Sequence, residues 1–312
     1  QVKELRVGRD LWKGIAAYSP RQLAGADVDG RVDGAASFVW QPRLPGRLAI
    51  GANLSLTKGR IQDQRLPRPI TDLSGKVVVE DGVVRVEELR GKCGSATFAL
   101  ALKREGLSGK APLALAGQIA NLPLDSQLYK TLPAILQSQW DKYQPAGVVH
   151  VDSFQAVFDG QRWRPPAAVL SGSGLSFESD KFPYRLVRGS GTLQVEPPSG
   201  GSPSRIDLNL TGYSGQQPVR IVGQVFDPRP GARGWIEIAG NELEVDKAMI
   251  DALEEKPRQV LAELHPRGTF NVFWRLDRKT PGGRPQTHLR LELVDISVNY
   301  DRFPSPLPGV RG

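Results

Sequence analysis

One segment of the sequence returns 121 residues later, and this repeat restricts the folds open to the chain. Residues 125–151, DSQLYKTLPAILQSQWDKYQPAGVVHV, correspond without a gap to residues 246–272, DKAMIDALEEKPRQVLAELHPRGTFNV. Pro145 and Gly147 match Pro266 and Gly268, and most other pairs keep their apolar or polar character. A repeat of this length indicates successive copies of one structural unit.

Each copy begins with a segment that has the pattern of a short helix. Asp125 and Asp246 are suited to cap helices over residues 125–143 and 246–264. Pro133 and Pro257 fall inside these segments, so we expect a kink or two short helices in each. A weaker copy, offset by 117 residues, predicts a further helical segment within residues 10–23.

The residues between the helical segments alternate between apolar and polar side chains, which is typical of strands with one buried face. Residues 96–102 show this alternation, and Glu80-Asp81-Gly82 is typical of a hairpin turn. The 34 glycines and 25 prolines also favour strands and turns over long helices. We therefore expect a mainly β fold with short helices, in which an elongated antiparallel sheet repeats about every 121 residues.

The repeat also predicts how the chain is organised. Residues 1–29 would end a preceding unit, residues 30–152 and 153–273 would form one unit each, and residues 274–312 would begin another. We interpret the chain as a fragment of a longer protein, because it stops partway through a unit.

The sequence contains no recognisable catalytic or metal-binding motif. His150, His265 and His288 are separated and do not recur between the copies, and the single cysteine, Cys93, excludes an internal disulfide. The net charge is +8, but the 41 basic residues are mixed with 33 acidic ones and form no basic block. This charge indicates a solvated basic surface or, alternatively, a preference for anionic lipid head groups. We expect no catalytic residue, no metal, no cofactor, no nucleic-acid partner and no membrane-spanning helix.

Four features occur together: long strand-rich units, Leu73-Ser-Gly-Lys-Val followed by Leu89-Arg-Gly-x-x-Gly, few residues suited to catalysis, and a short leucine-rich helical insertion ending in Pro-x-Gly. In these features the chain resembles the AsmA-like family of bacterial envelope proteins, which are akin to the bridge-like, repeating β-groove lipid-transfer proteins. The resemblance implies a β-taco sheet with an apolar concave face and a polar outer face. It further implies a non-enzymatic role in phospholipid transport or outer-membrane assembly in the periplasm. The parent protein would be anchored in the inner membrane by a segment outside this sequence, and its partner would be a phospholipid or another acyl-chain lipid.

An apolar sheet face must close on itself, be covered by helices or hold an apolar ligand. Two hypotheses therefore stay open: a hydrophobic groove that binds lipid, and a structural or interaction repeat of the cell envelope with a closed β core and no lipid. The side chains that we expect to line a groove are Val77, Val79, Phe98, Leu100, Leu193, Val195, Ile221, Ile236, Ile296 and Val298.

Overall fold

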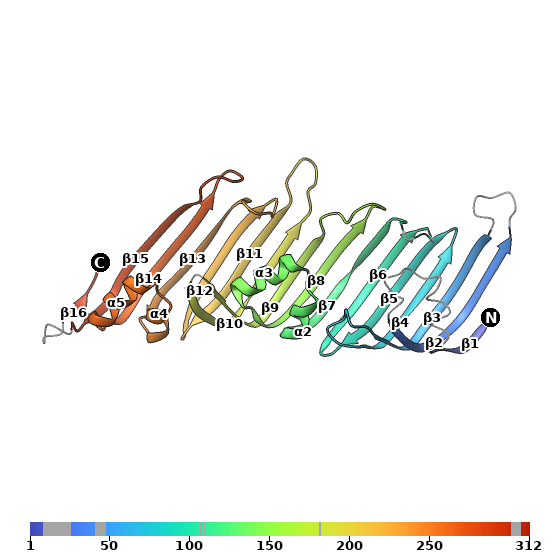
Figure 1. Ribbon diagram of the computed structural model, residues 1–312, viewed down its shortest axis with the longest axis horizontal. Coiled ribbons are helices and arrows are strands. Elements are labelled where there is room, and N and C mark those ends of the chain that lie inside the picture. The colour runs from blue at the N-terminus through green and yellow to red at the C-terminus, as the bar shows by residue number, and fades with distance from the viewer. Residues whose placement is uncertain (9–25, 41–47, 107, 109, 181, 301–306) are drawn as a thin grey trace. The chain divides into compact units, whose positions relative to one another are not determined.

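The computed structural model describes the chain except for residues 9–25, 41–47, 107, 109, 181 and 301–306 (Figure 1). The helical segment expected within residues 10–23 lies outside the described residues. By their contacts the residues divide into two compact units, which we call the first unit (residues 1–131 and 149–169) and the second unit (residues 132–148 and 170–312).

The described strands form one open antiparallel sheet of 16 strands, ordered β1 to β16 as in the sequence. Figure 1 shows each strand beside the next one along the chain. This confirms the expected mainly β, antiparallel fold, whereas the 121-residue repeat length and its boundaries stay predictions. The strands are β1 (Val2–Val7), β2 (Asp27–Trp40), β3 (Leu48–Gln62), β4 (Ile70–Glu80), β5 (Val83–Cys93), β6 (Ala96–Glu105), β7 (Leu113–Leu124), β8 (Ala146–Phe158), β9 (Ala167–Ser179), β10 (Phe182–Glu196), β11 (Arg205–Ser214), β12 (Gln217–Phe226), β13 (Arg233–Glu244), β14 (Arg267–Arg278), β15 (Gln286–Val298) and β16 (Leu307–Val310).

Each of the two matched helical segments contains two short helices, as expected. They are α2 (Ser126–Thr131) and α3 (Ala134–Tyr143), then α4 (Lys247–Asp251) and α5 (Glu255–Leu264). Pro133 immediately precedes α3 and separates it from α2. Pro257 does not separate α4 from α5, because it lies within the first turn of α5, where proline is tolerated.

Aspartate side chains cap both segments. Asp125 Oδ1 accepts the backbone N–H groups of Gln127 and Leu128, each at 3.0 Å. Asp246 Oδ1 accepts the N–H of Met249 at 2.7 Å. These bonds satisfy amide donors that have no partner within the first helical turn, which confirms both predicted caps.

The turn predicted at Glu80-Asp81-Gly82 is also present. It joins β4 to β5, and both Asp81 (φ 50°) and Gly82 (φ 75°) have left-handed backbones. Two such residues form the type I′ turn that matches the twist of a two-residue hairpin.

Bulges bend many of the strands. Lys58, Asp72 and Glu88 in the first unit have left-handed backbones, with φ of 52°, 53° and 50°, and each lies at a shift of strand register. Arg188 and Glu242 do the same in the second unit, both with φ of 52°. A bulge adds one residue to one strand and bends it, so the apolar spacing changes from two residues to three at that point.

Leucines pack over glycines beside these bulges. A Cβ added to Gly212 would lie 2.9 Å from Leu186 Cβ, and one added to Gly240 would lie 3.0 Å from Leu243 Cδ1. The two leucines are buried and belong, with Val219 and Ile221, to the hydrophobic core of the second unit. The core therefore lies where the bent strands and the small glycines allow close approach.

Candidate functional site: an apolar sheet face in each unit

The strand register of the second unit places apolar side chains on one face. Ile221 on β12 pairs with Leu210 on β11 and with Ile238 on β13. Directly paired residues point to the same side of a sheet, and every second residue along a strand does so too. This face, which we call the second apolar face, comprises Leu193, Val195, Ile206, Leu208, Leu210, Val219, Ile221, Val225, Ile236, Ile238, Leu243, Phe270, Val272, Trp274, Leu276, Leu289, Leu291, Leu293 and Ile296.

The first unit has a corresponding face. Val77 on β4 pairs with Leu54 on β3 and with Val86 on β5, and Val86 pairs with Leu102 on β6. This face, the first apolar face, comprises Val32, Leu54, Leu56, Leu73, Val77, Val79, Val84, Val86, Leu89, Phe98, Leu100, Leu102, Leu113, Leu115 and Ile119.

The register brings nine of the ten groove candidates together in two sets. Val77, Val79, Phe98 and Leu100 share the first apolar face, and Leu193, Val195, Ile221, Ile236 and Ile296 share the second. Val298 follows Ile296 on the same strand and pairs with Leu307 on β16. Ile221 and Ile296 are buried, at 8% and 4% exposure, while the other eight candidates are half-buried.

The opposite face of the second unit carries charged pairs. Arg205 bonds Asp207 at 2.7 Å and Glu196 at 2.9 Å. Arg275 bonds Glu237 at 3.0 Å, and its guanidinium lies 4.9 Å from the centre of the Trp235 ring. The sheet is therefore apolar on one side and polar on the other in this unit.

The most exposed part of the second apolar face was not among the candidates. Leu289 and Leu291 on β15 are 56% and 55% exposed, although they pair with Trp274 and Val272 on β14. The alternation of leucines at 289, 291 and 293 is the sequence signal that marks these positions. Large apolar side chains this exposed commonly mark a binding surface.

The helices leave large apolar side chains in contact with solvent. The helices α3 and α5 contain no buried residue, and Ile135 and Val260 are 65% and 57% exposed. In the described part of the chain, every helix is too short or too polar to cross a membrane.

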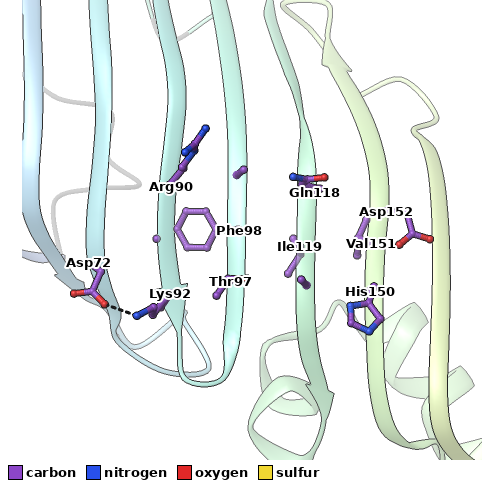
Figure 2. A pocket seen from close by; sticks show the side chains of 13 residues that line it. Asp72, Arg90, Lys92, Thr97, Phe98, Gln118, Ile119, His150, Val151 and Asp152 are labelled. Atoms are coloured by element: carbon purple, nitrogen blue, oxygen red, sulfur yellow. Dashed lines mark ion pairs between the residues drawn. The ribbon is translucent and has the colours of Figure 1, made fainter.

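A pocket of about 510 Å³ lies in the first unit, lined by residues of β4 to β8 (Figure 2). Its lining includes the candidate Phe98 together with Ile119, and Figure 2 shows the Asp72–Lys92 ion pair at its edge. That pair has an O–N distance of 3.0 Å, and His150 Nδ1 in the same lining accepts the backbone N–H of Asn121 at 3.2 Å. These side chains are thus engaged within the protein. Lys92 pairs with Thr97 and Thr97 pairs with Ala120, one residue out of step with Phe98, so this polar lining belongs to the face opposite the first apolar face.

A half-buried tyrosine, Tyr184, links the core of the second unit to α4. The hydroxyl oxygen of Tyr184 lies 2.6 Å from Ser214 Oγ and donates to Asp246 Oδ2 at 3.2 Å. Burial raises the pKa of Tyr184, and the nearby Asp246 carboxylate raises it further. The hydrogen bond with Ser214 lowers the pKa but does not outweigh these two effects. The arrangement holds the capping aspartate of α4 in place, which is a structural role.

Among the described residues, no three histidine, cysteine, aspartate or glutamate side chains are grouped so that they could hold a metal ion. The feature with functional character is therefore the apolar face of each unit. No protein-family model matches the chain, and neither the curated proteins nor the solved structures contain a match to it.

Proposed function

We propose that this chain is a non-enzymatic, lipid-binding segment of an AsmA-like protein of the bacterial cell envelope. In this role its apolar faces hold the acyl chains of phospholipids during their transport or during outer-membrane assembly in the periplasm. The parent protein reaches the membrane through regions outside this sequence.

The observation that supports the proposal is an apolar sheet face with large side chains that remain in contact with water. Leu289 and Leu291 are each more than half exposed, yet they continue a face whose centre is a buried core. An acyl chain gains about 0.8 kcal/mol for each CH₂ that it buries. Such a face can therefore bind lipid without a dedicated polar site.

A structural scaffold without lipid is the second candidate function. It is favoured by the cluster of Leu186, Val219, Ile221 and Leu243, which is buried by the protein alone. On that view the exposed leucines would contact another protein rather than a lipid.

Binding of a fluorescent phospholipid to the purified protein, together with native mass spectrometry, tests the lipid proposal. A double variant, Leu289→Gln with Leu291→Gln, makes the exposed part of the face polar without adding charge. The matched control is Arg290→Gln, which lies between them and points to the opposite face, where Arg290 pairs with Phe273.

We expect the wild-type protein and the control to bind phospholipid and the double variant to bind several-fold less, with unchanged thermal unfolding. Absence of bound lipid from the wild-type protein in both measurements would overturn the proposal and favour the scaffold.

A further inference from the structure

Each apolar face carries one arginine. Arg104 on β6 pairs with Val84 on β5 and with Leu113 on β7, and it follows Leu100 and Leu102 in the alternation of its strand. It is the one charged side chain in the described register of the first apolar face.

Arg278 has the corresponding place on the second apolar face. It is the last residue of β14 and pairs with Gly234 on β13, which in turn pairs with Val225 on β12. Among the residue pairs whose strand register is described, no other charged side chain lies on this face. Both arginines therefore lie near the ends of their strands, next to the loops that lead to β7 and β15.

Neither guanidinium has an acidic partner among the described residues. Arg104 Nη2 donates to the carbonyl oxygen of Ser108 at 2.6 Å, and Arg278 Nη1 donates to that of Ala232 at 3.3 Å. The Nε atom of each is buried and has no hydrogen-bond partner in the described structure.

The nearest acids along the chain are already paired on the other face. Glu105 bonds Lys103 at 3.0 Å, and Asp277 lies 3.5 Å from Arg275. A guanidinium has five N–H donors and stays charged, so a buried Nε without a partner is unfavourable unless an acceptor arrives.

We infer that Arg104 and Arg278 each receive the anionic head group, a phosphate or a carboxylate, of an amphiphile whose hydrocarbon chain lies on the same apolar face. This inference rests on the proposed lipid-binding function and adds to it a preference for anionic head groups. The planar guanidinium fork matches the oxygen atoms of phosphate and carboxylate in two-point hydrogen bonds.

The length of each face suits an acyl chain that starts at the arginine. The stretch from Phe98 to Arg104 spans roughly 20 Å, and that from Phe270 to Arg278 roughly 26 Å, at ~3.3 Å per residue. The hydrocarbon part of one bilayer leaflet is ~15 Å thick, half of the ~30 Å core. The stretch of apolar face that begins at each arginine is therefore at least as long as the hydrocarbon part of one leaflet.

Binding of three probes tests the inference: dodecyl phosphate, neutral dodecyl maltoside and inorganic phosphate. The test protein is the double variant Arg104→Gln with Arg278→Gln. The matched control is Arg85→Gln with Arg220→Gln, because Arg85 pairs with Lys103 and Arg220 pairs with Ala239 on the opposite faces. Thermal unfolding checks that each variant folds. A third double variant, Arg104→Lys with Arg278→Lys, keeps the positive charges but lacks the planar guanidinium groups.

We expect the double glutamine variant to bind dodecyl phosphate about tenfold more weakly than wild type, which corresponds to about 1.4 kcal/mol. Binding of dodecyl maltoside should be unchanged, the lysine variant should be intermediate, and the control should match wild type.

An equal loss for both amphiphiles, or no loss for either, would overturn the head-group inference and leave the lipid proposal standing. Inorganic phosphate that binds as tightly as dodecyl phosphate would also overturn it, because the arginines would then form a site for a free anion. If neither amphiphile binds the wild-type protein, the proposed function fails and the inference fails with it.

Discussion

His150 Nδ1 accepts a hydrogen bond from the backbone N–H of Asn121 at 3.2 Å. The same contact occurs 121 residues later, where Asn271 Oδ1 accepts the N–H of Glu242 at 2.8 Å. Asn121 and Glu242 both have left-handed backbones, with φ of 56° and 52°. Glu242 lies at a shift of strand register, and there the acceptor satisfies an amide that the bulge withdraws from the sheet ladder.

A third instance lies near the start of the chain. Asp33 Oδ1 accepts the N–H of Glu4, another left-handed residue, at 2.7 Å, and the two are again 29 residues apart. An aspartate, a histidine and an asparagine thus fill the same role. This assigns His150 a structural part as an acceptor.

Replacing His150 with leucine removes the acceptor and should lower the free energy of unfolding by about 1 kcal/mol, the usual net value of one hydrogen bond. His150→Asn should retain most of the stability, because asparagine fills the equivalent position at 271. Urea unfolding followed by circular dichroism measures both. Equal destabilisation by the two substitutions would show that ring packing, rather than the acceptor, matters.

Gly268 should tolerate no side chain. Its φ is 129°, and an added Cβ would lie 1.7 Å from the carbonyl oxygen of Asp295 on the neighbouring strand. We expect Gly268→Ala to cost more than about 3 kcal/mol, since strain and a backbone clash combine.

The control for this substitution is Gly282→Ala. Gly282 has a φ of 71°, and its added Cβ would meet nothing within 4 Å, so the cost should be about 1 kcal/mol from the left-handed backbone alone. Denaturant midpoints that coincide for the two alanine variants would contradict the predicted clash.

Ile221 and Leu291 lie on the same apolar face but should respond differently to truncation. Ile221 is 8% exposed and part of the core, so Ile221→Ala should cost about 2–5 kcal/mol. Leu291 is 55% exposed, and Leu291→Ala should change stability by about 0.5 kcal/mol or less while weakening phospholipid binding. Thermal unfolding and lipid titration on the same samples separate the two effects, and the reverse order of stability loss would show that the core lies nearer β15.

The first unit should lose stability in acid through Asp125. Burial tends to raise the pKa of this carboxyl, but the hydrogen bonds from Arg68, Leu128 and Gln127 outweigh it and lower the pKa below its ordinary value of 3.8. The ionised form is therefore favoured in the folded state. Its contribution is complete above pH 3.8 and is lost as the pH falls through the lowered value.

Unfolding of wild type and Asp125→Asn, followed between pH 7 and pH 2, measures this contribution. The difference in midpoint should be constant above about pH 5 and should shrink below the ordinary aspartate pKa. A difference that does not change with pH would mean that the carboxylate charge is unimportant for the cap.

Much of the fold could be predicted because alternation and capping are local signals. The hairpin at Asp81-Gly82 and the caps at Asp125 and Asp246 follow from short-range chemistry, and the structure contains all three. The alternation at Phe98 and Leu100 also indicated which residues of β6 share a face.

The bulges were harder to predict. Lys58, Asp72 and Glu88 are ordinary polar residues, and a left-handed backbone at such positions depends on tertiary packing rather than on residue type. Only the widening of the apolar spacing, as from Val86 to Leu89, marks them in the sequence. Arg104 and Arg278 were not predicted as site residues, because a charged residue after alternating apolar residues is also typical of a strand end.

The bulges also determine which changes in length the chain can accept. Deleting Glu88 would remove the bulge and leave strict alternation across β5, so Leu89, Gly91 and Cys93 would stay on the same side as Val86. One residue lost from a regular stretch of a strand would instead turn every residue beyond it to the other face. Along this sheet, single deletions should therefore be tolerated at bulges and in hairpin loops and should be disruptive in the regular stretches between them.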